Sequence, residues 1–192
     1  MHVGISELKC EQGDPDAARQ HLARAEELGD SLGLPKNPYR SRVAKAHLLQ
    51  LVGDLDGAME LLHEAERVYD SDFSPEVRPI AAMRVRVLVA QGELDDALRW
   101  AYDHGLSVDD ELSYVREFEH LTLARVLLAR HRLPEAMGLL GQLLHAADEG
   151  NRTGSVLEIL VLQSLGHQAR GDTAHALVVL GCAYLDRDQP SS

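Results

Sequence analysis

One short pattern recurs five times along the chain at an almost constant spacing. Each copy contains a turn-forming pair, which is a glycine followed by an acidic residue in four of the five copies. An alanine stands five residues after the first member of the pair, and an apolar residue stands four residues after the alanine. The alanines are 39 or 40 residues apart, at Ala18, Ala58, Ala97, Ala136 and Ala176. A fixed period of this length with one helix–turn–helix pattern per unit is typical of a solenoid. We therefore predict an all-α array of about five stacked hairpins.

Each unit is predicted to consist of a first helix, a tight turn and a second helix. Glycine in the turn can adopt the left-handed conformation that ends the first helix, and the acidic residue can cap the second. His131 stands where the other units have glycine, so a longer or differently closed turn is expected there. The predicted helices are 38–52, 55–69, 74–91, 94–104, 110–130, 133–148, 155–170 and 173–185.

The repeat also predicts the domain organisation. No linker between units is long or low in complexity, so residues 1–186 are expected to form a single domain, with a frayed tail at 187–192. Only Met1 to Glu11 precede the first turn, which predicts an incomplete first hairpin. We expect the chain to be a piece of a longer protein, because a natural solenoid would carry a polar capping repeat at this end.

Charge and hydropathy restrict the partners of the chain. It has 31 acidic and 19 basic side chains, a formal net charge of −12, so no direct nucleic-acid contact and no membrane contact are expected. No apolar run reaches the roughly 18 residues of a membrane-spanning helix, and the start lacks the apolar stretch of a signal peptide. Cys10 and Cys182 lie at opposite ends of the array, too far apart for a disulfide. These features predict a cytoplasmic location.

No catalytic residue, metal site or cofactor is predicted in this segment, and the chain is not predicted to be an enzyme. Two Glu-x-x-His pairs, Glu60 with His63 and Glu117 with His120, have the spacing of di-iron bundle ligands. They lie on helices that a solenoid keeps apart, so we interpret them as exposed ion pairs. The chain has no H-E-x-x-H, C-x-x-C or G-x-S-x-G motif.

The repeated pattern G-D-x-x-x-A resembles the tetratricopeptide repeat, whose usual period is about 34 residues. The longer period here indicates a variant of that repeat. Two stretches are more specific, 72–79 with 84–92 and 109–114 with 116–129. They resemble the sensor region of the large ATP-dependent LuxR-family transcription regulators of the MalT-like class, over residues 12–186.

This resemblance implies a right-handed superhelical array of tetratricopeptide-like hairpins with a role in transcription regulation. Members of that class carry an N-terminal nucleotide-binding module and a C-terminal helix-turn-helix. The chain contains neither a phosphate-loop motif nor a basic recognition helix. This segment would then supply effector sensing and protein contacts, including contacts with the other domains of the parent regulator. A standalone tetratricopeptide-type scaffold or adaptor is the alternative.

Stacking of the hairpins predicts where a ligand would bind. In tetratricopeptide-like arrays the first helices line the concave groove, and equivalent positions form ladders across units. His47, Arg86 and Arg125 form one such ladder, and His120 belongs to a second. These four residues are the predicted binding residues for a peptide, protein or small anionic effector, because guanidinium groups bind carboxylates and phosphates. Pairing with carboxylates of adjacent repeats would explain them without a ligand. Self-association into a homo-oligomer is compatible with the same surface.

Two further predictions concern the third and fourth units. Trp100 and Phe118 are expected to pack in the core. His104 replaces alanine in a helix-packing column, which predicts a looser or kinked contact between these units.

Overall fold

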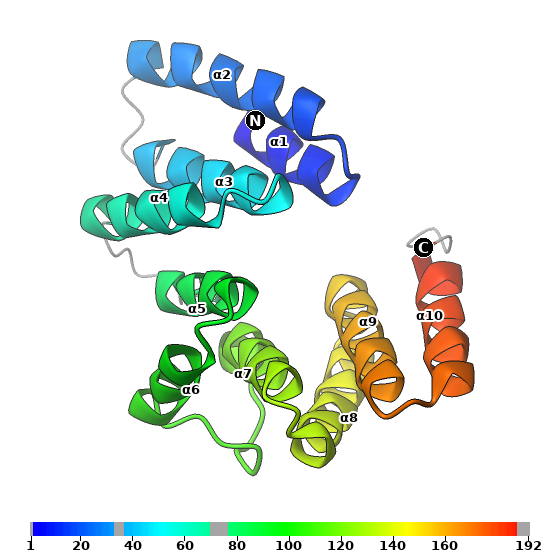
Figure 1. Ribbon diagram of the computed structural model, residues 1–192. Coiled ribbons are helices and arrows are strands. Elements are labelled where there is room, and N and C mark those ends of the chain that lie inside the picture. Colours follow the sequence, from blue (N-terminus) through cyan, green and yellow to red (C-terminus); the bar gives the residue numbers. More distant parts are fainter. Residues whose placement is uncertain (1, 33–36, 70–76, 188–192) are drawn as a thin grey trace. The chain divides into compact units, whose positions relative to one another are not determined.

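The computed structural model describes residues 2–32, 37–69 and 77–187, and every regular element in these ranges is helical (Figure 1). The all-α prediction is therefore confirmed for the described residues. The elements are α1 (His2–Glu11), α2 (Pro15–Leu32), α3 (Asn37–Leu51), α4 (Leu55–Val68), α5 (Ile80–Gln91), α6 (Leu94–Asp103), the 3-10 helix η1 (Tyr114–Arg116), α7 (Glu117–Ala129), α8 (Leu133–Glu149), α9 (Thr153–Ala169) and α10 (Thr173–Arg187). Along the described helices no segment is both long and apolar enough to cross a membrane.

The chain divides into two compact units, residues 1–75 and 76–192, which we call the N-terminal unit and the C-terminal unit. The N-terminal unit contains α1 to α4, and the C-terminal unit contains α5 to α10. A single domain over 1–186 stays a prediction. The predicted tail at 187–192 lies almost entirely outside the described residues.

The periodic alanines are buried in the helix packing. Ala18, Ala58, Ala97 and Ala136 are completely buried, and Ala176 is 6% exposed. In the N-terminal unit α2 packs against both α1 and α3. A side chain no larger than a methyl group lets helices come together. The apolar residue four positions later is buried in the first four units and 45% exposed in the fifth, at Leu180.

The turns repeat one backbone geometry. Gly13, Gly53, Gly92 and Gly171 all have a φ between 71° and 84°, as a left-handed helix end requires. The prediction of a different turn at His131 is wrong, because His131 adopts the same left-handed conformation with a φ of 56°. Its backbone N–H donates to the carbonyl of Leu128, as Gly92 N–H donates to the carbonyl of Val89. The predicted acidic caps are present where Asp14, Asp54 and Asp172 accept backbone N–H groups at the starts of α2, α4 and α10.

In the C-terminal unit α7 is the central helix. It contacts α5, α6, α8 and α9, and its buried residues form one core with those of α8 and α9. The largest completely buried side chains of this core include Leu127, Leu140 and Ile159. Within this unit α5, α7 and α9 are the first helices of three successive hairpins (Figure 1).

Two predicted helix starts are wrong. The predicted helix 74–91 starts in the structure only at Ile80, after Pro79 in extended conformation, while its first residues lie outside the described ranges. The predicted helix 110–130 starts only at Glu117. Residues 104–113 form a loop instead, in which Ser107 N–H donates to the carboxylate of Asp110 and Leu106 is buried.

The α6 helix ends immediately before His104, and the looser contact expected there stays a prediction. The helix has 10 residues and stops at Asp103, while α8 has 17. His104 is exposed and its ring lies 5.3 Å from the ring of Trp100, which is 9% exposed and packs in the core as predicted. The α1 helix also has 10 residues, and it packs against α2 and α3 as the first helix of its hairpin.

Candidate ligand-binding site

Charged side chains from three successive hairpins meet in the C-terminal unit. Arg86 comes from α5, Arg125 from α7 and Glu158 from α9. One oxygen of Glu158, Oε1, lies 2.9 Å from Arg86 Nη2 and 3.0 Å from Arg125 Nη2. Arg125 Nε donates to the same oxygen at 3.2 Å. With Phe118 and Thr122, which hold Arg86, these residues form what we call the arginine cluster.

Arg86 is positioned by α7 as well as by Glu158. Its Nε donates to the hydroxyl oxygen of Thr122 at 3.0 Å, and that hydroxyl donates to the carbonyl of Phe118 at 2.8 Å. The guanidinium carbon lies 3.8 Å from the centroid of the Phe118 ring, a cation–π distance. Phe118 was expected in the core; it is half-buried, packs against the core and supports the guanidinium.

The cluster carries one net positive charge. Burial raises the pKa of Glu158, but Arg86 and Arg125 outweigh it and hold that pKa below its usual value, so the carboxylate is ionised. Burial, and to a lesser degree repulsion from Arg125, lower the pKa of Arg86 to about 10 against the attraction of Glu158. Two guanidiniums and one carboxylate therefore leave an excess of one positive charge at neutral pH.

One polar atom of the cluster is incompletely satisfied. Arg86 Nη2 is buried and has no aligned hydrogen-bond acceptor among the described residues, although Glu158 is within ion-pair distance. A buried donor without an aligned acceptor costs about 1–3 kcal/mol. The side chains still reach solvent, since Arg86 is 19% and Arg125 34% exposed. The cluster thus combines excess positive charge, a donor poorly aligned with its carboxylate and access from outside.

The other two predicted binding residues lie elsewhere. His47 is half-buried on α3 in the N-terminal unit. His120 is completely buried: its Nδ1 lies 3.0 Å from the carbonyl oxygen of Arg116 and its Nε2 3.1 Å from Asp110 Oδ2. Its ring therefore anchors the loop 104–113 to α7 and does not face a ligand. The sequence did not predict the loop that covers His120.

Sequence reasoning missed Glu158, Thr122 and Phe118 as members of the site. It did include pairing of the ladder arginines with carboxylates of adjacent repeats, and Glu158 is such a carboxylate, on the helix that follows in the array. No sequence signal distinguishes it from the chain's other acidic residues.

The Glu-x-x-His pair on α7 does not form a chelate. Glu117 accepts from Arg152 Nε at 2.7 Å and from the hydroxyl of Ser155, whereas His120 contacts Asp110. In the part of the chain that the structure describes, no three His, Cys, Asp or Glu side chains are grouped to hold a metal ion.

Comparison with known proteins agrees with this architecture. The chain matches the family model of the MalT-like TPR region over residues 1–184. No curated protein matches it. Among solved structures it is similar to a Podospora anserina protein provisionally assigned as a kinesin light chain, with nearly identical TPR-like repeats. The TM-score is 0.53 at 17% identity, and the match covers 97% of this chain and 92% of that chain. This likeness shows the fold, a helical repeat of the tetratricopeptide type. The family match extends over nearly the whole chain, and the chain therefore belongs to the MalT-like TPR region family.

Proposed function

We propose that the chain is the effector-sensing and protein-interaction module of a LuxR-family transcription regulator of the MalT-like class. The family match supports the MalT-like part of this proposal. The regulator role follows from the resemblance of the two stretches in the third and fourth units. In this proposal ATP hydrolysis and DNA binding belong to other domains of the parent protein, the module has no catalytic activity or cofactor of its own, and it works in the cytoplasm.

The arginine cluster is the observation that carries the sensing role. It takes one charged side chain from each of three successive first helices, so an anion bound there would contact Arg86 on α5 and Arg125 on α7 in the place that the Glu158 carboxylate of α9 now occupies. Arg86 and Arg125 would bind the anion, and Phe118 and Thr122 would hold Arg86 in place. A carboxylate or phosphate suits these guanidiniums because charge-assisted hydrogen bonds to them are strong. His47 remains a separate proposed contact in the N-terminal unit.

Glu158 provides a route from binding to conformational change. It is ion-paired to α5 through Arg86 and to α7 through Arg125. An incoming anion competes with Glu158 for both guanidiniums, so the bound state loses the tie between α9 and α5. A ligand shifts a conformational equilibrium only through contacts that differ between the two states. The exchange of Glu158 for ligand is such a difference.

The binding test uses variants of the cluster. Isothermal titration with citrate, inorganic phosphate and a glutamate-rich peptide should reveal an anion that binds the wild-type chain. The double variant Arg86→Gln/Arg125→Gln should bind that anion at least tenfold more weakly. Arg99, an exposed arginine of α6 paired with Asp96, supplies the control Arg99→Gln, which should bind like wild type. Equal binding by the double variant would remove the cluster as the site.

The regulator role is tested separately, on the parent reading frame. A phosphate-loop motif upstream and a helix-turn-helix downstream would agree with the proposal. A frame with neither would defeat it in favour of the scaffold or adaptor.

A separate observation favours this alternative function as a scaffold or adaptor. The last hairpin exposes apolar side chains, with Leu177 at 65%, Val178 at 64% and Leu165 at 51% exposure. Helical repeats form extended surfaces for binding other proteins. Co-purification of a partner that is lost in Leu177→Glu and retained in Arg86→Gln/Arg125→Gln would favour the scaffold.

A further inference from the structure

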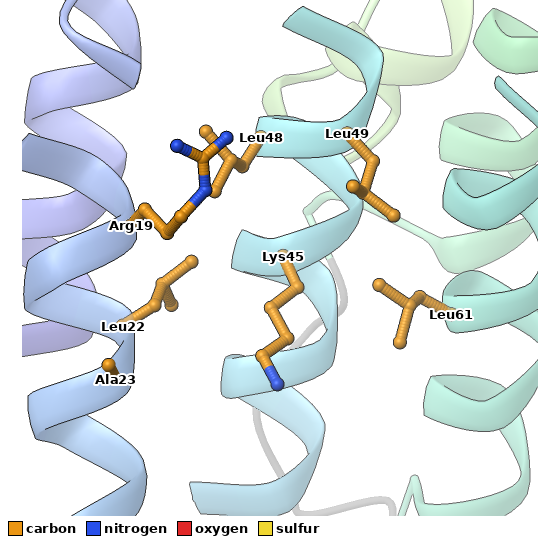
Figure 2. A pocket seen from close by; sticks show the side chains of 7 residues that line it. All are labelled: Arg19, Leu22, Ala23, Lys45, Leu48, Leu49 and Leu61. Carbon is orange, nitrogen blue, oxygen red and sulfur yellow. The ribbon is translucent and has the colours of Figure 1, made fainter. Parts of the chain in front are cut away.

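A hollow of about 220 Å³ lies in the N-terminal unit, whereas the arginine cluster belongs to the C-terminal unit. It opens between α2, α3 and α4, and its walls are mainly leucine (Figure 2). The residues that matter here are Leu22, Leu48, Leu49 and Leu61, with Arg19 and Lys45. A cavity of about 150 Å³ holds benzene, so this hollow has room for a somewhat larger hydrocarbon group.

Two basic residues, Arg19 and Lys45, add positive charge to this mainly apolar hollow. The hydrocarbon stems of Arg19, from α2, and Lys45, from α3, extend along its walls, while their charged ends lie at different places on its border (Figure 2). Long basic side chains commonly bury the stem and keep the charge in water. Arg19 also pairs with Asp16 at 2.8 Å, but both side chains are mostly exposed, and an ion pair of this kind is weak and easily exchanged.

The repeat shows that these charges are not required by the packing. Arg19 directly follows the periodic Ala18, and Leu98 directly follows Ala97. Lys45 lies eight residues before the turn glycine Gly53, just as Leu123 lies eight residues before His131.

In the C-terminal unit the corresponding place therefore lies between α6, α7 and α8. There Leu123 is 4% exposed and Leu98 packs against the core. The N-terminal unit thus has cations at both positions where the place between α6, α7 and α8 has leucines that complete the core, although Arg84 and Gln163 stand at the Lys45 position in the other two hairpins of the C-terminal unit.

We propose that this hollow is a binding site for a small amphiphilic carboxylate, a monoanion with a short hydrocarbon chain. The chain would lie against the leucines, and the carboxylate would pair with Lys45 or Arg19. A single carboxylate suits the site, because the charged ends of Arg19 and Lys45 lie at different places on its border and one group can pair with only one of them. This inference is independent of the proposed function, since it concerns different residues in the other unit.

The test measures the binding of sodium octanoate to the chain by isothermal titration calorimetry. Octanoate should bind and acetate should not, and affinity should rise about fourfold per methylene from butanoate to octanoate while apolar area is being buried. 1-Octanol and octylamine, which lack the carboxylate, should bind at least tenfold more weakly than octanoate. Absence of octanoate binding, or equal binding of octylamine, would overturn the proposal. So would binding of acetyl-leucyl-leucine in place of octanoate, which would make the ligand a peptide terminus.

Variants locate the binding. Arg19→Leu/Lys45→Leu installs the leucines found at the matching positions between α6, α7 and α8. It should reduce octanoate affinity at least tenfold without loss of helical circular dichroism. The matched control is Arg24→Leu/Arg40→Leu, which removes two exposed arginines from the same two helices outside the hollow. That control should bind octanoate like wild type.

Two further variants keep the proposal falsifiable. Lys45→Gln retains most of the stem and should weaken octanoate but leave octanol binding unchanged, which covers the case in which the double leucine variant does not fold. Arg86→Gln/Arg125→Gln should bind octanoate normally, and this separates the hollow from the arginine cluster. Octanoate binding that is unchanged in Lys45→Gln and in the double leucine variant would place the ligand elsewhere and overturn the assignment.

Discussion

The guanidinium of Arg86 lies over the ring of Phe118, with its carbon 3.8 Å from the ring centroid, and thereby joins α5 to α7. The same guanidinium donates to Thr122, one turn further along α7. The contact is largely shielded from water, which strengthens the attraction between a cation and an aromatic face.

Removing the ring should therefore destabilise the C-terminal unit. Phe118→Leu retains apolar volume but loses the π face, and the free energy of unfolding should fall by about 1–2 kcal/mol. Urea denaturation followed by circular dichroism measures the change. In an Arg86→Gln background, the same Phe118 substitution should cost clearly less. Equal costs in the two backgrounds would mean that the ring stabilises the fold by packing alone.

Glu158→Gln should have two opposite effects. It leaves two neighbouring guanidiniums without their carboxylate, so stability should fall by about 2–4 kcal/mol, close to the cost of breaking a largely buried ion pair. It should also bind sulfate or phosphate more tightly than wild type, because the competing carboxylate is gone. Thermal unfolding with increasing sulfate separates the two effects. A variant that is destabilised but gains no extra stabilisation from sulfate would contradict a role in anion binding.

The pH dependence of stability should depend on Glu158 in a defined direction. Its folded-state pKa is lowered, with burial opposing and both arginines favouring the charged form. The stabilisation is therefore complete above the unfolded-state pKa, about 4.3, and is lost as pH falls through the folded-state value. Urea midpoints between pH 3 and pH 7 should fall less steeply with acidification in Glu158→Gln than in wild type. Parallel slopes would be the contrary result.

The loop 104–113 should detach when its anchor is removed. Asp110 accepts from Ser107 N–H and contacts the buried His120, while Arg116 donates to the carbonyl of His104. Asp110→Ala should make the loop markedly more sensitive to limited proteolysis while the rest of the chain stays folded. Asp109→Ala, an exposed neighbour, is the control. Mass spectrometry of the first cleavage product gives the readout, and cleavage elsewhere first would argue against local release.

The turn at His131 offers a stabilising substitution. A non-glycine residue with a φ of 56° is strained, whereas glycine adopts this conformation freely. His131→Gly should raise the free energy of unfolding by about 0.5–1 kcal/mol. The converse variant Gly92→Ala has open space around its added methyl group but a φ of 83°, so it should lose a similar amount. If His131→Gly destabilises the chain, a side-chain contact of His131 must outweigh the strain.

The repeat period made most of the architecture predictable. The spacing of the alanines and turn pairs predicts the hairpins, and those alanines are buried because they lie at helix contacts. Helix starts were less predictable. Residues 110–113 are compatible with a helix by composition, but they lie in the loop in which Asp110 contacts His120 and Leu106 is buried.

The sequence predicted the two arginines of the site but not the carboxylate that joins them. The ladder placed Arg86 and Arg125 at matching positions of adjacent hairpins, and the structure brings them to one carboxylate. The same reasoning put His120 into the groove, because register alone does not say which neighbours cover a side chain. Glu158 could not be singled out, since its role depends on which of many acidic side chains meets the arginines in space.

The sharing of Glu158 Oε1 by two guanidiniums also defines a stoichiometry. One acceptor oxygen contacts both guanidiniums, so Arg86 and Arg125 together form a binding site for one negative group. A ligand with one carboxylate must displace Glu158 in order to pair with both arginines. A dicarboxylate can pair with Arg86 through one carboxylate and with Arg125 through the other. The valence of the ligand, as much as its affinity, would then determine whether α9 is released from α5.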